Sequence, residues 1–165
     1  MNHPSLPHHN PNANVHNTIG IMLLSYDVTQ FITDGCCCDA LQGKRIDFSY
    51  WRALRVIEIG SHSFQYVTGV DIVGLSQLER VVIGRNCFSQ EPVLSDEGVI
   101  PHFAVKDCER LKELRIGRKS FCYYGICEID NNAALEVIEM GKMDEASDSF
   151  VSGNLKTTSI LLTRE

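Results

Sequence analysis

Apolar residues recur along the chain at offsets that repeat four times. A leucine starts each repeat, and apolar residues follow it three and five positions later. The starting residues are Leu54, Leu78, Leu111 and Leu135; the third positions hold Ile57, Val81, Leu114 and Ile138, and the fifth positions Ile59, Ile83, Ile116 and Met140. Apolar residues two positions apart are typical of a strand with one buried face. The pattern therefore predicts one short strand in each repeat.

A glycine follows each predicted strand, and a phenylalanine follows the glycine in three of the four repeats. The glycines are Gly60, Gly84, Gly117 and Gly141, and the phenylalanines are Phe64, Phe88 and Phe121. Glu145 stands where the fourth phenylalanine is expected. Glycine is favoured where the backbone needs a positive φ, so we expect a tight turn at each glycine.

A second alternating segment lies upstream of each leucine and predicts a second strand in each repeat. Its apolar pairs are Ile46 and Phe48, Val70 and Ile72, Phe103 and Val105, and Cys127 and Ile129; they enclose Asp47, Asp71, Ala104 and Glu128, which we expect to face outward. Successive leucines lie 24, 33 and 24 residues apart. Repeats of this length stack around one continuous core. The predicted fold class is mainly β, a right-handed β-solenoid with units of about 24 residues and little helix.

These residues resemble the leucine-rich repeats, and in particular the BspA-type repeats with two short strands per unit. The resemblance rests on the phrase "LxxLxIG…SF", on the two-strand unit and on Cys108 three residues before Leu111, and it covers roughly residues 24–163. Glycine stands where the BspA type usually has proline, and one unit is longer than the others. The resemblance implies a binding scaffold, an adhesin or a recognition module rather than an enzyme.

The two ends of the chain depart from the repeat. Residues 1–18 are rich in histidine, proline and asparagine, and we expect a disordered tail there, before a repeat domain over 19–165. A degenerate opening unit is expected from Leu24, and a last unit from Leu155 to Ile160. No polar cap follows that last unit, so the chain is either a fragment of a longer array or associates with itself through an uncapped end.

Composition narrows the range of partners. The chain has 165 residues, is 44% hydrophobic and carries a net charge of −6. This charge argues against nucleic-acid binding, because no basic excess is present to neutralise phosphates. No apolar run approaches the roughly 18 residues of a membrane span. The N-terminal segment lacks the apolar stretch of a secretory signal, so we expect a cytoplasmic protein.

The outward positions of the first strand are the first candidate binding surface, because these positions usually bind partners in leucine-rich repeats. They are Arg55, Val56 and Glu58 in the first repeat, Glu79, Arg80 and Val82 in the second, Lys112, Glu113 and Arg115 in the third, and Glu136, Val137 and Glu139 in the fourth. At the first of these positions (Arg55, Glu79, Lys112 and Glu136) the charge alternates in sign from repeat to repeat. This alternation fits a self-neutralising ladder or a site for another protein, and the two functions are compatible.

The long repeat supplies the second candidate surface. Its nine extra residues lie within 89–102, and loops of this kind carry function more often than the frame does. The candidate partner-binding residues are Glu91, Val93, Leu94, Asp96 and Glu97. A tolerated insertion without function is the alternative, since a longer loop costs little entropy.

The cysteines indicate packing rather than a site. Cys87, Cys108 and Cys127 occupy repeat positions that hold small or apolar residues in the other repeats, so we expect them in the core. Cys36, Cys37 and Cys38 are adjacent, and at least one of them is expected at the surface. An odd number of cysteines favours reduced thiols. The sequence has no CxxC pair, which would indicate a zinc site, and we expect no cofactor or metal.

No catalytic motif accompanies the repeats. The segment "GRKS" lacks the upstream glycine of a phosphate loop, and His62 and His102 have no nucleophile placed beside them by a motif. We therefore expect no enzyme, but a protein-interaction scaffold whose partner is another protein. A surface or secreted adhesin-like protein, and a repeat fragment without independent function, remain open alternatives.

Overall fold

Strands dominate the part of the chain that the structure describes. The computed structural model describes residues 12–41, 43–89, 100–141, 150 and 154–157. Within these ranges the helical elements are α1 (Thr18–Met22) and the 3-10 helix η1 (Phe48–Tyr50). The predicted mainly-β class with little helix is confirmed.

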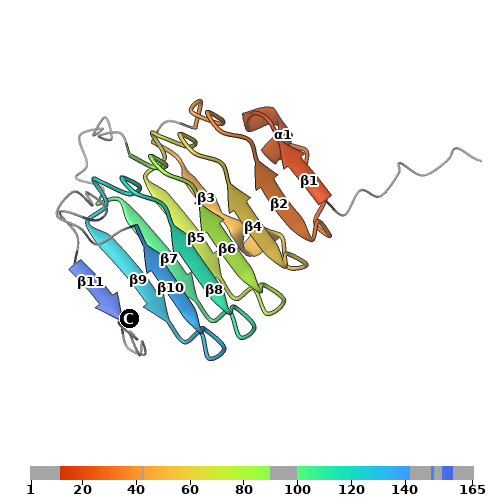
Figure 1. Ribbon diagram of the computed structural model, residues 1–165. Helices are drawn as coiled ribbons and strands as arrows, with labels where there is room; N and C mark the ends of the chain where they lie inside the picture. Colours follow the sequence, from red (N-terminus) through yellow and green to blue (C-terminus); the bar gives the residue numbers. More distant parts are fainter. Residues whose placement is uncertain (1–11, 42, 90–99, 142–149, 151–153, 158–165) are drawn as a thin grey trace, which may run out of the picture.

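The strands form two parallel sheets, and from β2 onward they alternate between the sheets along the chain (Figure 1). Sheet A has the order β1 (Asn12–Val15), β2 (Gln30–Thr33), β4 (Val56–Ile59), β6 (Arg80–Ile83), β8 (Glu113–Ile116) and β10 (Val137–Met140). Sheet B has the order β3 (Arg45–Asp47), β5 (Gly69–Val73), β7 (His102–Lys106), β9 (Ile126–Asp130) and β11 (Asn154–Thr157). We call one strand of each sheet and the turns that join them a rung.

Strand register reproduces the repeat of the sequence. Ile57 lies beside Val81, Val81 beside Leu114, and Leu114 beside Ile138. In sheet B, Val70 lies beside Ile46 and Phe103. Residues of equal repeat position are therefore neighbours in space, and they bury the same face on each rung.

The core lies between the two sheets. Leu54, Leu78 and Leu111 are fully buried at the start of each sheet A segment, and Val28 fills the same position one rung earlier. This face is continuous because no rung could bury its apolar side alone. The N-terminal end of the core is aromatic: the ring of Phe31 packs edge-on against Phe48, with centroids 5.1 Å apart.

A stack of phenyl rings runs through the turns between the sheets. Phe64, Phe88 and Phe121 are fully buried, and their rings lie nearly parallel, with centroids 5.6 and 4.7 Å apart. Phe150 continues the stack over Phe121, although its position in the sequence did not predict this. The last described rung therefore has its phenylalanine, which stands five residues after Glu145.

The glycine that follows each of the strands β4, β6, β8 and β10 recurs for a different reason from the one expected. Among Gly60, Gly84, Gly117 and Gly141, only Gly141 has a positive φ. A Cβ atom on Gly117 would lie 2.6 Å from the backbone of Arg85 and Gly84, and one on Gly60 would lie 2.5 Å from the backbone of Asp34 and Gly35. Side chains are excluded here because neighbouring rungs bring their backbones together. The expectation of a positive φ at every such glycine is wrong.

The ends of the array differ from the predicted boundaries. Residues 12–15 form strand β1, paired with β2, inside the segment expected to be a disordered tail. Asn17 then caps α1, its side chain accepting a hydrogen bond of 2.9 Å from the Gly20 amide. At the other end, Leu155 lies beside Cys127 in sheet B, so this segment completes a rung and does not begin a new one. Residues 1–11 lie outside the described part of the chain.

Candidate functional site

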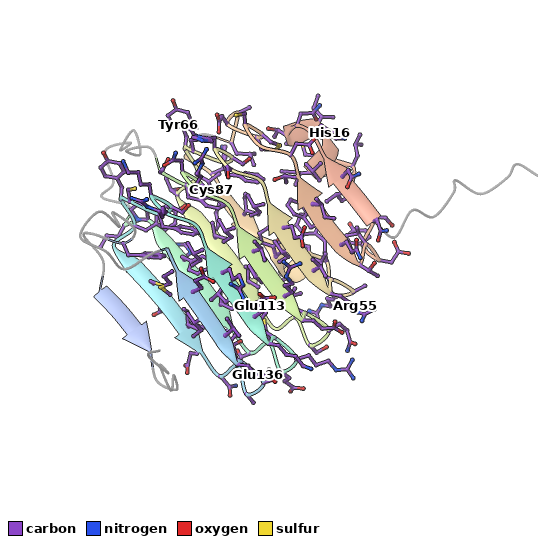
Figure 2. All side chains as sticks on the ribbon, in the orientation of Figure 1. His16, Arg55, Tyr66, Cys87, Glu113 and Glu136 are labelled. Carbon is purple, nitrogen blue, oxygen red and sulfur yellow. A yellow bond between two sulfur atoms is a disulfide. The ribbon has the colours of Figure 1, made fainter. Side chains whose placement is uncertain are left out.

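The outward side chains of sheet A form one continuous surface, which we call the strand face. Figure 2 shows Arg55, Glu113 and Glu136 following one another across this front sheet. Parallel register places Val56 beside Arg80, Arg80 beside Glu113, and Glu113 beside Val137. The twelve predicted residues therefore lie together on four neighbouring rungs, as the sequence pattern required.

Ion pairs connect the rungs of the strand face. Arg80 donates hydrogen bonds to Glu58 at 2.5 Å and to Glu113 at 2.9 Å. Arg115 in turn contacts Glu113 on its own strand and Glu139 on the next rung. One chain of contacts thus runs from β4 to β10 through two arginines and three glutamates.

A second ion pair joins the positions just before the strands. The Arg55 guanidinium donates to Glu79 at 2.9 Å, and both side chains are well exposed. The expected alternation continues in the sequence with Lys112 and Glu136, but the ion pairs found within the described ranges do not include this one. The self-neutralising ladder is therefore present over most of the strand face and incomplete at its Lys112–Glu136 step.

The charges of the ladder influence each other's titration. The hydrogen bond from Arg115 lowers the pKa of Glu113 below its usual value, with Arg80 adding to the effect. The same pair raises the pKa of the Arg115 guanidinium. Both groups stay ionised at neutral pH, and because the pair lies at the surface it contributes little to stability.

Valines lie among these charges. Val137 is 37% exposed, and Val56 and Val82 are half-buried on the same face. Apolar side chains surrounded by compensated charges provide contact area without a strong electrostatic field of one sign. Such a surface suits a protein partner better than a polyanion.

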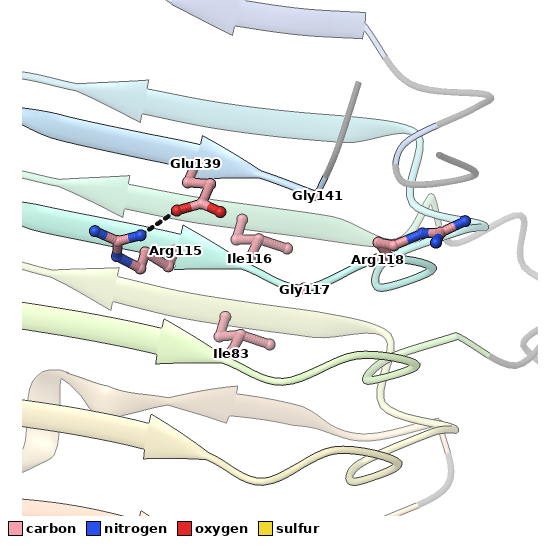
Figure 3. Close-up of a pocket in the computed structure, with 7 residues that line it drawn as sticks. All are labelled: Ile83, Arg115, Ile116, Gly117, Arg118, Glu139 and Gly141. Atoms are coloured by element: carbon pink, nitrogen blue, oxygen red, sulfur yellow. Dashed lines mark hydrogen bonds and ion pairs between the residues drawn. The ribbon is translucent and has the colours of Figure 1, made fainter. Parts of the chain in front are cut away.

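A shallow hollow of about 360 Å³ lies at the carboxyl end of the strand face, and we call it the strand-end hollow. It is lined by Ile83, Arg115, Ile116, Gly117, Arg118, Glu139 and Gly141. Figure 3 shows the Arg115–Glu139 ion pair over one side of the hollow and the Arg118 side chain directed away from that pair, toward the turns. The glycines keep this edge free of side chains, which makes the hollow wide and shallow.

Sheet B carries a cluster that the sequence did not predict. Asp71 was expected to face outward, yet it is only 6% exposed. Its Oδ2 atom accepts hydrogen bonds from Arg45 Nε and from His102 Nε2, the second at 3.1 Å. A Cβ atom on Gly69 would lie 2.8 Å from the His102 ring, so this glycine makes room for the cluster. A desolvated carboxylate with two donors locks three rungs together.

Ala104 was also expected to be solvent-facing and is buried, at 6% exposure. Beside it, Lys106 and Glu128 form an ion pair across β7 and β9, and this pair raises the pKa of Lys106. For Asp71 the cover comes from the arginine and the histidine that donate hydrogen bonds to it, whose side chains lie over it. The sequence predicted that the side chains of Asp71 and Ala104 point outward from the sheet, but it did not predict that they are buried by neighbouring side chains.

The cysteines follow the predicted packing with one exception. Cys87, Cys108 and Cys127 are fully buried, and burial raises the pKa of the first two thiols to about 11 and of the third to about 12. Cys36 is exposed. The Sγ atoms of Cys37 and Cys38 are placed together as a vicinal disulfide, which differs from the expectation of reduced thiols.

The repeat accounts for the placement of that pair. Cys37 occupies the small-residue position of Ser63 and Ser120, and its amide bonds to the Ser63 hydroxyl at 3.2 Å. Cys38 stands at the phenylalanine position and shares its left-handed backbone, with φ of 69° against 55° at Phe64. Cys37 and Cys38 therefore form the same turn as on the other rungs, with a smaller side chain at the phenylalanine position.

The second candidate surface, the insertion of the long repeat, is not among the described residues. The insertion residues Glu91, Val93, Leu94, Asp96 and Glu97 lie outside the described residues. In the part of the chain that is described, three or more His, Cys, Asp or Glu side chains do not gather in a group that could hold a metal ion. No described helix is long and apolar enough to cross a membrane.

Comparison with known proteins adds no relative. No family model, no curated protein and no solved structure matches the chain.

Proposed function

We propose that the chain is a non-catalytic protein-interaction module, built as a leucine-rich-repeat β-solenoid of the BspA type, which binds another protein on its strand face. The observation that carries this proposal is the outward face of β4, β6, β8 and β10, where valines lie among ion pairs that span the rungs. The repeat template and the equal register of its positions support the solenoid assignment. The non-catalytic part rests on the lack of a catalytic motif in the sequence.

The ladder favours specificity over affinity. Each of its arginines already contacts carboxylates of the chain. The charged side chains are therefore held in position before a partner binds. Charges arranged in this way exclude partners with mismatched charge more than they strengthen binding. The binding energy would come mainly from burial of the valines and the aliphatic stems of the arginines.

A capture experiment with matched valine variants tests the proposal. One bait carries Val56→Ser, Val82→Ser and Val137→Ser on the strand face; the control bait carries Val73→Ser, a half-buried valine on the outer side of sheet B. We expect partners from a lysate of the source cells to bind the wild type and the control but not the triple variant. Equal capture by all three baits would remove the strand face from the proposal.

An adhesin-like protein of the cell surface or the secreted fraction is the second candidate. The observation that favours it is the Cys37–Cys38 disulfide, since disulfides persist in oxidising compartments. Thiol titration after denaturation, in the absence of reductant, separates the two candidates. Five titratable thiols would favour the second candidate, and seven would favour the first.

A further inference from the structure

The turns after sheet A form a second hollow, separate from the strand face. It has a volume of about 320 Å³ and is lined by His62, Arg85, Asn86, Arg118 and Lys119. We call it the turn hollow. Three of its five lining residues are cationic, and none is a carboxylate, in a chain whose net charge is −6.

The backbone fixes where these side chains stand. His62, Asn86 and Lys119 share a left-handed conformation, with φ of 62°, 53° and 57°. The His62 amide donates to the Arg85 carbonyl, and the Asn86 amide to the Arg118 carbonyl, both at 2.9 Å. The turns therefore stack in register, and Arg85 and Arg118 hold the same position on neighbouring rungs, about 4.8 Å apart along the stack.

Charges in the turn hollow are arranged opposite to those on the strand face. On the strand face, a charged residue such as Arg80 has carboxylates on the neighbouring rungs. In the turn hollow, Arg85 lies beside Arg118, and neither guanidinium forms an ion pair with another described residue. Like charges on adjacent strands repel each other, and an anion bound between them would relieve this repulsion.

We propose that the turn hollow binds the phosphate group of a phosphate monoester, with Arg85 and Arg118 as its principal ligands. A guanidinium presents two parallel N–H donors that match two oxygens of a phosphate, and two stacked arginines can bind one group from both sides. The Lys119 ammonium adds a third positive charge, and the Asn86 amide nitrogen lies 3.5 Å from His62 Nδ1 at the same hollow. The two guanidinium groups favour a dianion over a carboxylate, because a single negative charge would compensate only one of them.

The neighbouring surface leaves room for the remainder of such a ligand. Arg118 lines both the turn hollow and the strand-end hollow, so the two are adjacent. Gly117 and Gly141 line the strand-end hollow without filling it, since neither has a side chain (Figure 3). A ligand held by its phosphate at the turns can therefore extend toward Arg115 and Glu139.

Calorimetric titration at constant ionic strength tests the proposal. The probes are inorganic phosphate, the tripeptide Gly-phosphoserine-Gly and the same tripeptide without phosphate. The variants are Arg85→Gln, Arg118→Gln and the double variant, with Arg52→Gln as the control for loss of an exposed arginine elsewhere. Circular dichroism melting of each variant without ligand verifies that it folds. We expect saturable binding of both phosphate probes, weakened about tenfold by each single substitution and unchanged by the control.

The outcomes separate the sources of the phosphate and decide the proposal. Equal affinity for inorganic phosphate and the phosphorylated tripeptide would assign binding to the phosphate group alone; tighter binding of the peptide would add contacts from the strand-end hollow. Either result supports the proposal if the double variant binds neither probe. Absence of saturation with the wild type, saturation that survives in the double variant, or equal binding of the unphosphorylated tripeptide would overturn it. None of these results depends on a partner at the strand face.

Discussion

The phenyl ring of Phe150 lies flat on that of Phe121, with centroids 5.1 Å apart and an angle of 10° between the planes. Phe150 also shares the left-handed backbone of Phe64, Phe88 and Phe121, and its amide donates to the Phe121 carbonyl. The same local conformation thus recurs although the spacing to the preceding phenylalanine has changed. Stacking of the rings, rather than a fixed repeat length, defines this position.

Truncating the phenyl stack is expected to destabilise the protein by an amount that depends on burial. Phe88→Ala removes a fully buried ring and should lower the free energy of unfolding by about 3–5 kcal/mol. Phe150→Ala should cost less, about 1–2 kcal/mol, because its ring is partly exposed at the end of the stack. Urea unfolding measures both values. Tyr123→Ala, at a residue that is 46% exposed, is the control and should change stability by less than about 0.5 kcal/mol.

Adding one methyl group at a glycine of sheet A is expected to be as harmful as an overpacked core. In Gly117→Ala the new Cβ would lie 2.6 Å from backbone atoms of the adjacent rung, which cannot move aside alone. We expect a loss of about 1–3 kcal/mol, or failure to fold. Gly20→Ala is the matched control, since its nearest neighbour would be 3.6 Å away and alanine favours a helix. A thermal melt of Gly117→Ala equal to that of the control would contradict the backbone-contact explanation.

The ladder of the strand face predicts an acid-sensitive carboxylate. The pKa of Glu113 is lowered by its hydrogen bond to Arg115, so its stabilising contribution is present above the ordinary glutamate value of 4.5. That contribution is lost as the pH falls through the lowered pKa of the folded state. Carbon-detected NMR titration should give Glu113 a midpoint below 4.5, and Arg115→Gln should move it back up. An unchanged midpoint in this variant would show that the pair is not formed in solution.

The buried thiols predict a loss of stability in alkali. Burial raises the pKa values of Cys87 and Cys108 to about 11 and that of Cys127 to about 12, from 9.0 in an unfolded chain. The stability contributed by these protonated thiols is fully present below pH 9 and decreases as the pH rises toward 11 and 12, because only the unfolded state releases the protons early. Urea unfolding at pH 8 and near pH 11 measures the decrease.

Alkylation with iodoacetamide provides an independent measurement of the same thiols. At pH 8, the exposed Cys36 should react first, while Cys87, Cys108 and Cys127 should react only after unfolding. Mass spectrometry of peptides after brief labelling gives the order, and labelling in denaturant gives the full count. Rapid reaction of Cys87 in the native protein would mean that its rung opens readily.

The sequence predicted most of sheet A because buried and outward-facing positions alternate clearly along its strands. Ile57 and Ile59 enclose Glu58, and a strand with one buried face fits that alternation. It failed at Leu155, because an apolar residue beside a lysine is equally typical of either sheet, and only the pairing with β9 decides between them. It failed at β1 because the Asn-rich segment has a low intrinsic preference for a strand and forms one by pairing with β2.

The surfaces were only partly predictable for a related reason. Arg80 and Glu113 could be paired from the template alone, since equal repeat positions are neighbours. The Asp71 cluster could not, because it needs the space left by Gly69 and a histidine from the long repeat. The turn hollow could not either, because the direction of Arg85 and Arg118 depends on the left-handed backbone of the residue that follows each of them. Asparagine has some preference for the left-handed conformation, so residue preference supports it at Asn86, whereas at Lys119 the stacked turns impose it.

The order of the strands has a mechanical consequence. Because every described strand pairs with the strands of adjacent rungs, β1 and β11 lie at opposite ends of the molecule (Figure 1). Tension between these ends acts across the strands, so it loads the hydrogen bonds of one rung before those of the next. The molecule would lengthen in steps under a small force, as a zipper opens, whereas tension along the strands would be shared by all the bonds of a pair.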